Sequence, residues 1–256
     1  MRLMDGAEAI RGDLPTASTH VVDVPLEAGD EQGTGVGRFG SLRIVRDRSL
    51  EVLEALSGRV VVIGGDCGVQ LAPIGHALHQ ANGDVAVVWF DAQPDLNTAA
   101  SSPSGAFSGM VLRALTGDGP EAIVPPVLLD PSRIILAGAR SIDEGEADYI
   151  ETAGIRSLSV DQLQQADELV AAIEATGAAS VYLHIDLDVL DPGELEGIGE
   201  PVPFGLAAST LIELIRAVTS RFAIAGAGVA SYSPASPEDS TNDLPTILRL
   251  IGALAS

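Results

Sequence analysis

The chain has 256 residues, of which 46% are apolar, and carries a formal net charge of −22. This length and apolar content exclude a disordered chain and favour a single domain over residues 1–256. The acidic charge argues against nucleic acid and anionic membranes as partners, because both are negatively charged themselves.

The start of the chain and its cysteine content both predict a cytoplasmic location. The first residues, MRLMDGAEAIRGD, lack the apolar core of a secretion signal. No apolar run reaches the roughly 18 residues needed to span a bilayer. The single cysteine, Cys67, cannot form a disulfide within the chain, which fits a reducing compartment.

Short apolar, β-branched segments alternate with helical patterns along the whole chain. The predicted strands cover 19–25, 59–65, 85–92, 133–139, 155–160, 180–190 and 222–230. Segments 41–58 and 161–177 carry apolar residues at three- and four-residue steps and end in Gly, which predicts helices. Several strands are apolar on both faces, as in a parallel sheet covered by helices. The pattern therefore predicts a three-layer α/β domain.

Acidic side chains, accompanied by one cysteine and one histidine, gather at the ends of three predicted strands. They are Asp66 and Cys67 after the second strand, Asp91 and Asp95 after the third, and His184, Asp186 and Asp188 in the sixth. Ligands of open parallel sheets bind beyond the carboxyl ends of the strands. Carboxylates that converge there must be neutralised by protons or by a cation, and oxygen ligands suit Mn²⁺ or Mg²⁺. A single Asp at a strand end is more often a turn or cap residue, so the prediction rests on the whole group.

Four segments resemble motifs of the ureohydrolase family, which includes arginase, agmatinase and formimidoylglutamase. They are GGDCGV, DAQPDLNTAASSPSG, AGARSIDEGEADYI and HIDLDVLDP. The resemblance implies a three-layer αβα sandwich with a mostly parallel sheet of about eight strands. It also implies hydrolysis of a C–N bond in a guanidino-, amidino- or formimino-type small molecule, with water activated by two Mn²⁺ ions.

The resemblance assigns metal-binding roles to six positions. Asp91 and Asp186 would bridge the ions, Cys67 and Asp95 would complete one shell, and Gln93 and Asp188 the other. Two of these depart from the family, which has His where this chain has Cys67 and Gln93. A thiolate suits softer ions than Mn²⁺, and a neutral amide is a weaker donor than imidazole. We therefore expect at most one well-occupied divalent ion, Mn²⁺, held chiefly by Asp91, Asp95 and Asp186. In the alternative interpretation, Cys67 is a packing residue and Gln93 hydrogen-bonds a carboxylate.

Other departures argue against L-arginine as the substrate. Ser108 stands where many relatives have a histidine that moves protons, and serine cannot do this near neutral pH. No acid lies between Gly226 and Pro237, where arginases carry the residues that anchor the guanidinium. Asn97, Ser104 and Ser108 are candidates for binding the substrate. His184 is the candidate catalytic residue, although a packed, hydrogen-bonded histidine is the interpretation that the sequence favours at this position.

Three hypotheses from different classes stay open at this point. The first is a metal-dependent hydrolase with an impaired second metal position. The second is a catalytically inactive protein of the same fold that binds a ligand or a partner. The third is an enzyme of another reaction class that uses the same pocket, with His184 as the base. A homo-oligomer is compatible with each of them.

Overall fold

A single parallel sheet lies at the centre of the computed structural model, which describes residues 2–236 and 239–255. Its strands in these residues are β1 (Val61–Ile63), β2 (Val85–Phe90), β3 (Ile134–Ala137), β4 (Arg156–Leu158), β5 (Ser180–Asp186) and β6 (Ala223–Ala230). Their order across the sheet is β1-β6-β5-β2-β3-β4, and every neighbouring pair is parallel.

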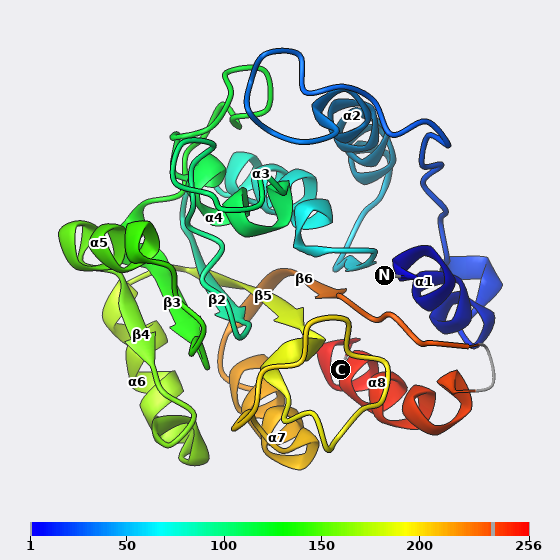
Figure 1. Ribbon diagram of the computed structural model, residues 1–256. Coiled ribbons are helices and arrows are strands. Elements are labelled where there is room, and N and C mark those ends of the chain that lie inside the picture. Colours follow the sequence, from blue (N-terminus) through cyan, green and yellow to red (C-terminus); the bar gives the residue numbers. More distant parts are fainter. Residues whose placement is uncertain (1, 237–238, 256) are drawn as a thin grey trace.

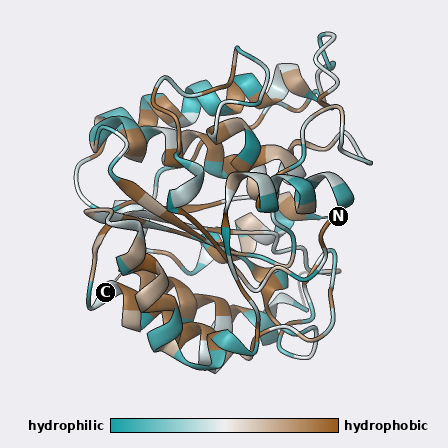
Figure 2. Cartoon of the chain, turned by 90° about the vertical axis from the view of Figure 1, so that its left-hand side faces the viewer, coloured by the Kyte–Doolittle hydropathy of each residue, from teal (hydrophilic) through white to brown (hydrophobic). Residues whose placement is uncertain are grey.

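Helices cover both faces of the sheet and complete three layers (Figure 1). The helices are α1 (Leu3–Gly12), α2 (Phe39–Ala55), α3 (Leu71–Gln80), α4 (Val111–Leu115), α5 (Glu144–Ala153), α6 (Ala166–Thr176), α7 (Ala208–Thr219) and α8 (Ser240–Ala255). One face packs against α2, α3 and α4, and the other against α6, α7 and α8, each with its own apolar core. Figure 2 shows apolar residues concentrated on the strands and on the helix faces turned towards them.

The elements follow from the sequence by ordinary rules. Every residue of β2, VAVVWF, is buried, as expected for a strand with helices on both faces. Helix α5 begins with a capping box in which Asp143 and Glu146 bond each other's backbone N–H groups. Helices α5 and α6 end at Gly154 and Gly177, where φ is +67° and +65°, a region that glycine enters without steric cost.

The predicted αβα fold with a parallel sheet is confirmed, but the structure differs from the prediction in three details. The expected sheet of about eight strands has six in the described residues. Segment 19–25 is no strand, because its chain runs along the surface, with Val21 and Val24 exposed and no neighbouring strand to bond. The predicted strand 180–190 ends at Asp186, whose side chain caps the 3₁₀ turn Leu187–Val189. Among the described residues, no helix is both long and apolar enough to cross a bilayer.

The strand order places a switch point between β2 and β5. From β2 the chain continues outwards to β3 and β4, whereas from β5 it continues in the opposite direction to β6. The connections on the two sides therefore diverge, and a crevice forms beyond the carboxyl ends of β2 and β5. Asp91 directly follows β2 and Asp186 is the last residue of β5. The topology thus brings these two carboxylates to the place where such sheets bind ligands.

Candidate metal centre

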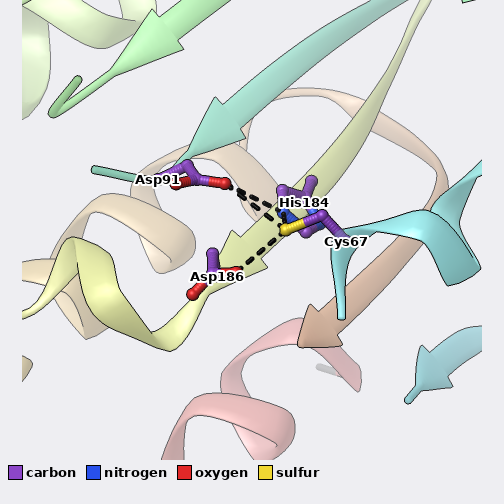
Figure 3. Close-up of side chains that lie close together, drawn as sticks. All are labelled: Cys67, Asp91, His184 and Asp186. Carbon is purple, nitrogen blue, oxygen red and sulfur yellow. Dashed lines mark hydrogen bonds and ion pairs between the residues drawn. The ribbon is translucent and has the colours of Figure 1, made fainter. Parts of the chain in front are cut away.

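Four donor groups from three strand ends meet at this switch point (Figure 3). Cys67 opens the 3₁₀ turn that follows β1, Asp91 follows β2, and His184 and Asp186 lie on one face of β5. One ligand atom of each residue lies within 4.8 Å of the others, and all four residues are buried. The predicted convergence of Asp91 and Asp186 is therefore present in the structure.

The thiol of Cys67 lies at the centre of this group. Its Sγ is 2.8 Å from Asp186 Oδ2, 3.4 Å from Asp91 Oδ2 and 3.4 Å from His184 Nε2. His184 Nε2 is 3.7 Å from Asp91 Oδ2. A thiol carries one proton and donates only one hydrogen bond at a time. The three short distances therefore describe a convergence of lone pairs, an arrangement that a cation would satisfy.

Gln93 links two of the carboxylates by hydrogen bonds. In the amide orientation that pairs donors with acceptors, its Nε2 donates to Asp188 Oδ2 at 2.7 Å and to Asp91 Oδ1 at 2.9 Å. The backbone N–H of Ala92 donates to Asp188 Oδ1 at 3.0 Å. The side chain of Asp188 is thus held by neutral donors. Hydrogen bonding by Gln93, the alternative left open by the sequence, is the arrangement that the structure favours.

Asp95 contributes a carboxylate that lacks a full set of partners. Its side chain is 4% exposed, and its buried Oδ2 accepts no hydrogen bond from the described residues. Its φ of +53° is unusual for a residue other than glycine. Two hydrogen bonds of neighbouring backbone N–H groups maintain this φ angle. Leu112 N–H donates to the Asp95 carbonyl at 3.1 Å, and Leu96 N–H donates to Glu146 Oε1 at 3.0 Å. A buried acceptor of this kind calls for an explanation, and a cation supplies one.

Burial and mutual repulsion make the carboxylates reluctant to ionise without a cation. Burial, followed by the charge of Asp186, raises the pKa of Asp91 well above its usual range. Burial and the charge of Asp91 do the same for Asp95. The pKa of Asp188 rises to about 11, again through burial and the charge of Asp186. Burial also raises the pKa of the Cys67 thiol. Such groups stay protonated unless a positive charge compensates them.

His184 is a neutral ring held in a fixed position. It is fully buried and stacks on Trp89 with the ring centroids 3.6 Å apart. Burial lowers its pKa to about 3, so the ring is uncharged near neutral pH. Its Nδ1 has no hydrogen-bond partner among the described residues, while Nε2 faces Cys67 and Asp91. A neutral imidazole of this kind can bind a metal ion through nitrogen, but it is a poor acceptor of protons.

The residues predicted to bind substrate lie on the loops next to this group. Asn97 is buried; its Nδ2 donates to Asp143 Oδ2 at 2.9 Å, and its Oδ1 accepts from Ser101 at 2.8 Å. Ser104 Oγ accepts a bond from Ala106 N–H at 3.1 Å. Ser108 lies in the 3₁₀ turn Phe107–Met110 and is partly buried. The first two side chains already have partners within the loop, and the substrate role of all three stays a prediction.

Sequence reasoning missed three residues that support the centre. Trp89 Nε1 donates to Asp91 Oδ2 at 3.1 Å, Ser231 Oγ donates to Asp186 Oδ2, and Glu146 accepts the N–H of Leu96. The position of Trp89 two residues before Asp91 on a strand was a usable signal, because alternate residues share a face. Ser231 gave no such signal, since its φ of +68° and its contact with β5 depend on the tertiary fold.

Removing the carboxylate of Glu146 is expected to destabilise the fold. Its two oxygens accept the backbone N–H groups of Leu96 and Asp143, each at 3.0 Å. Glu146→Ala leaves both donors without this partner, so the free energy of unfolding should fall by about 1–3 kcal/mol. Chemical denaturation measures the change, with Glu151→Ala as the control, because Glu151 is an exposed residue of the same helix. Equal effects of the two substitutions would contradict this assignment.

A cavity elsewhere in the molecule is separate from this centre. It is lined by residues at the starts of β5 and β6, including Ser180, Tyr182 and Ala225, together with His76 from α3. These residues lie at the amino-terminal edge of the sheet. The acidic group lies at the opposite edge, where catalytic sites of parallel sheets form, so the cavity does not compete with it as the candidate active site.

Known proteins share both the sequence pattern and the fold. The sequence profile of the Arginase family matches residues 10–250. An arginase of Bacillus subtilis is 35% identical over 156 residues, which cover 57% of this chain and 52% of that protein. An arginase of Entamoeba histolytica is 28% identical over 237 residues, covering 87% of this chain and 79% of that protein. The matched segment thus spans about half the length of the bacterial relative.

Solved structures extend the likeness over the whole chain. The crystal structure of Entamoeba histolytica arginase in complex with L-ornithine matches with a TM-score of 0.88 at 23% identity, covering 100% of this chain and 93% of that one. Formimidoylglutamase of Bacillus subtilis matches with a TM-score of 0.73 at 18% identity, covering 97% of this chain and 80% of that one. At these identities the structures establish a shared fold.

Proposed function

Because the chain belongs to the arginase family, we propose that it is a metal-dependent hydrolase that cleaves a C–N bond in a guanidino-, amidino- or formimino-type small molecule. The observation that supports this most strongly is the group of buried carboxylates at the switch point of the sheet. The hydrogen bonds that reach Asp91, Asp186 and Asp188 come from neutral donors. When these carboxylates ionise, a cation is therefore needed to compensate their charge. In a hydrolase of this family, such a cation would activate water for hydrolysis.

The donors present fit one divalent ion better than two. Cys67, Asp91, His184 and Asp186 each place one ligand atom within 4.8 Å of the others. Asp95 is not one of these four residues, although its buried Oδ2 has no hydrogen-bond partner among the described residues. At the second position, the amide of Gln93 donates hydrogen bonds to Asp91 and Asp188 and so occupies the oxygens that an ion would need. When bound, a divalent ion supplies Lewis-acid chemistry and lowers the pKa of water. Mn²⁺ suits the carboxylates, whereas the thiol and the imidazole suit a softer ion.

The residues of the chain have distinct parts in this proposal. Asp91 and Asp186 hold the ion, and their orientation is set by the bonds from Trp89 and Ser231. Gln93 keeps the carboxylate of Asp188 in place without adding charge. Side chains that are fixed in this way do not have to reorganise during the reaction, which is the main route by which a protein lowers a barrier.

L-Arginine is not the substrate that we propose. The segment between Gly226 and Pro237 carries no acid to anchor a guanidinium, and Ser108 cannot move a proton near neutral pH. We expect urea release from L-arginine to be far slower than the roughly 10 s⁻¹ of a typical enzyme. The test measures urea and ammonia release from L-arginine and from a panel of guanidino, amidino and formimino compounds. Turnover of L-arginine near the typical rate would refute this exclusion.

A variant of matched side-chain size tests whether the metal centre carries the proposed hydrolysis. Asp186→Asn keeps the size of the side chain but removes a charge from the centre, so it should abolish turnover of whichever compound of the panel is cleaved. Its folded state is checked by circular dichroism. Failure of every compound, with protein that binds a divalent ion, would favour the second candidate, an inactive binding protein of the same fold. The burial of the carboxylates, which are only 1–4% exposed, supports that candidate. A cytoplasmic location and a homo-oligomer stay predictions.

A further inference from the structure

Three distances within the metal centre are close to those between the ligands of a tetrahedral zinc ion. Bonds to zinc are about 2.3 Å from sulfur, about 2.0–2.1 Å from imidazole nitrogen and about 2.0–2.2 Å from carboxylate oxygen. At tetrahedral angles, neighbouring donors then lie roughly 3.3–3.6 Å apart. Cys67 Sγ lies 3.4 Å from Asp91 Oδ2 and 3.4 Å from His184 Nε2, and the latter two atoms are 3.7 Å apart. The distance from Cys67 Sγ to Asp186 Oδ2 is 2.8 Å and has to lengthen by about 0.7 Å when the thiol loses its proton. Asp186 also has a carboxylate oxygen within 4.8 Å of ligand atoms of Asp91 and His184.

His184 is placed as a ligand by the sheet itself. It lies two residues before Asp186 on β5, so both side chains project from the same face. It is also the neighbour of Trp89 across the sheet, and the two rings stack. The ring therefore cannot turn away from the thiol without losing this contact. The family has an imidazole at the position of Gln93, and this chain does not. His184 supplies an imidazole instead, from the adjacent strand and next to Cys67.

The four candidate ligands, Cys67, Asp91, His184 and Asp186, differ in their donor atoms from a manganese site. One sulfur, one nitrogen and two oxygens meet in a buried space, whereas Mn²⁺ favours oxygen-rich, six-coordinate surroundings. Thiolate and imidazole in a tetrahedral arrangement are typical of Zn²⁺. Asp188 does not take part, because Ala92 N–H and Gln93 already hold both of its oxygens.

We propose that Cys67, Asp91, His184 and Asp186 form a mononuclear tetrahedral site that selects Zn²⁺ over Mn²⁺. The inference deepens the proposed function, because it names the ion of the same centre. It is tested by binding in the absence of substrate, so it can succeed where hydrolysis fails, and the reverse also holds. Hydrolysis that needs Mn²⁺ in a protein without zinc would overturn the inference and leave the hydrolase proposal intact.

The first measurement is the metal content of the full chain purified without chelators, followed by titration of the metal-free protein. We expect one zinc per chain, which excess Mn²⁺ does not displace. Co²⁺ serves as the spectroscopic probe in place of zinc. A charge-transfer band from thiolate to cobalt, with the intense visible bands of a tetrahedral ion, supports the site. Two ions per chain, preference for Mn²⁺, or a cobalt spectrum without the thiolate band would overturn it.

Variants separate this ligand set from the arrangement of the family. Cys67→Ser and His184→Asn should each weaken zinc binding by more than the roughly 10–100-fold that loss of a supporting partner costs. His79→Asn is the control for imidazole loss, because His79 is exposed on α3 and should leave the affinity unchanged. Asp188→Asn should also retain zinc. If His184→Asn binds zinc as the parent does, or Asp188→Asn loses it, the proposed ligand set is wrong. Circular dichroism of each metal-free variant verifies folding, and the cobalt spectrum of the parent tests the site without any substitution.

Discussion

Removal of divalent ions is expected to make the protein lose stability as the pH rises from about 4 towards 8. The pKa values of Asp91, Asp95 and Asp188 are raised in the folded state, first by burial and then by repulsion from neighbouring carboxylates. Below the ordinary Asp pKa of 3.8, both states bind these protons. Above it, the unfolded chain releases them while the folded chain retains them, so each further pH unit favours unfolding.

A bound ion should reverse this loss. At a free ion concentration about 1,000 times the dissociation constant, binding stabilises the folded state by about 4 kcal/mol. For a chain of this size, that corresponds to a rise in Tm of roughly 8–16 °C. Thermal melts at pH 5 and pH 8, with chelator and with added ion, measure both effects. Unchanged or greater stability of the ion-free protein at pH 8 would show that the cluster is not the source of this coupling.

The chosen pH window separates the cluster from surface carboxylates. The pKa of Asp84 is lowered by its bond to Arg133, and that of Asp130 by Ser132. Stability from these groups is present above their ordinary pKa and is lost only as the pH falls below about 4. Between pH 5 and 8 they contribute no slope. Asp91→Asn is a matched variant, because it removes one buried acid and should flatten the curve of the ion-free protein.

Gln93→His is expected to add a second tightly bound ion. The amide now donates to Asp91 and Asp188 at once, and imidazole cannot reproduce both bonds. The substitution therefore frees two carboxylate oxygens and brings a stronger donor than an amide to the same place. We expect the affinity for the second ion to rise by at least roughly 10–100-fold. Calorimetric titration and metal analysis count the ions in parent and variant.

Gln93→Leu is the control for this experiment. It removes the hydrogen bonds to Asp91 and Asp188 but supplies no donor, so it should leave the number of bound ions unchanged. A second ion in the leucine variant would mean that release of the carboxylates, and not the imidazole, is decisive. Two tightly bound ions in the parent would show that the amide does not impair the second position at all.

The residues of the centre that lie at the end of a single strand could be predicted from the sequence. Apolar runs that stop at acids placed Asp91 and Asp186 at strand ends, and the preference of parallel sheets for ligands at that edge placed them together. The sequence left open that Gln93 bonds a carboxylate, but it could not identify Asp188 as the partner, because Asp188 follows another strand and the contact depends on strand order. The pairing of His184 with Trp89 likewise depends on the register of β5 against β2.

The central strands of the sheet were predicted better than the peripheral segment 19–25 and the ends of the strands. Central strands are recognisable because burial on both faces demands an uninterrupted apolar run, as in β2. Segment 19–25 has a similar β-branched composition, but a strand also needs a neighbour to accept its backbone hydrogen bonds, and composition says nothing about that. The capping of Leu187–Val189 by Asp186 similarly ended a strand that residue types alone would have continued to 190.

Trp89 is the only tryptophan of the chain, and it lies against the ring of His184 and bonds Asp91. All indole fluorescence of the protein therefore originates within the candidate centre. A change in the charge of Asp91, or in the electron density of the stacked imidazole, acts directly on the emitting group. The side chain is fully buried, so its emission comes from an apolar environment that solvent does not average. The molecule thus carries an intrinsic optical reporter of what happens at its own centre, without any added label.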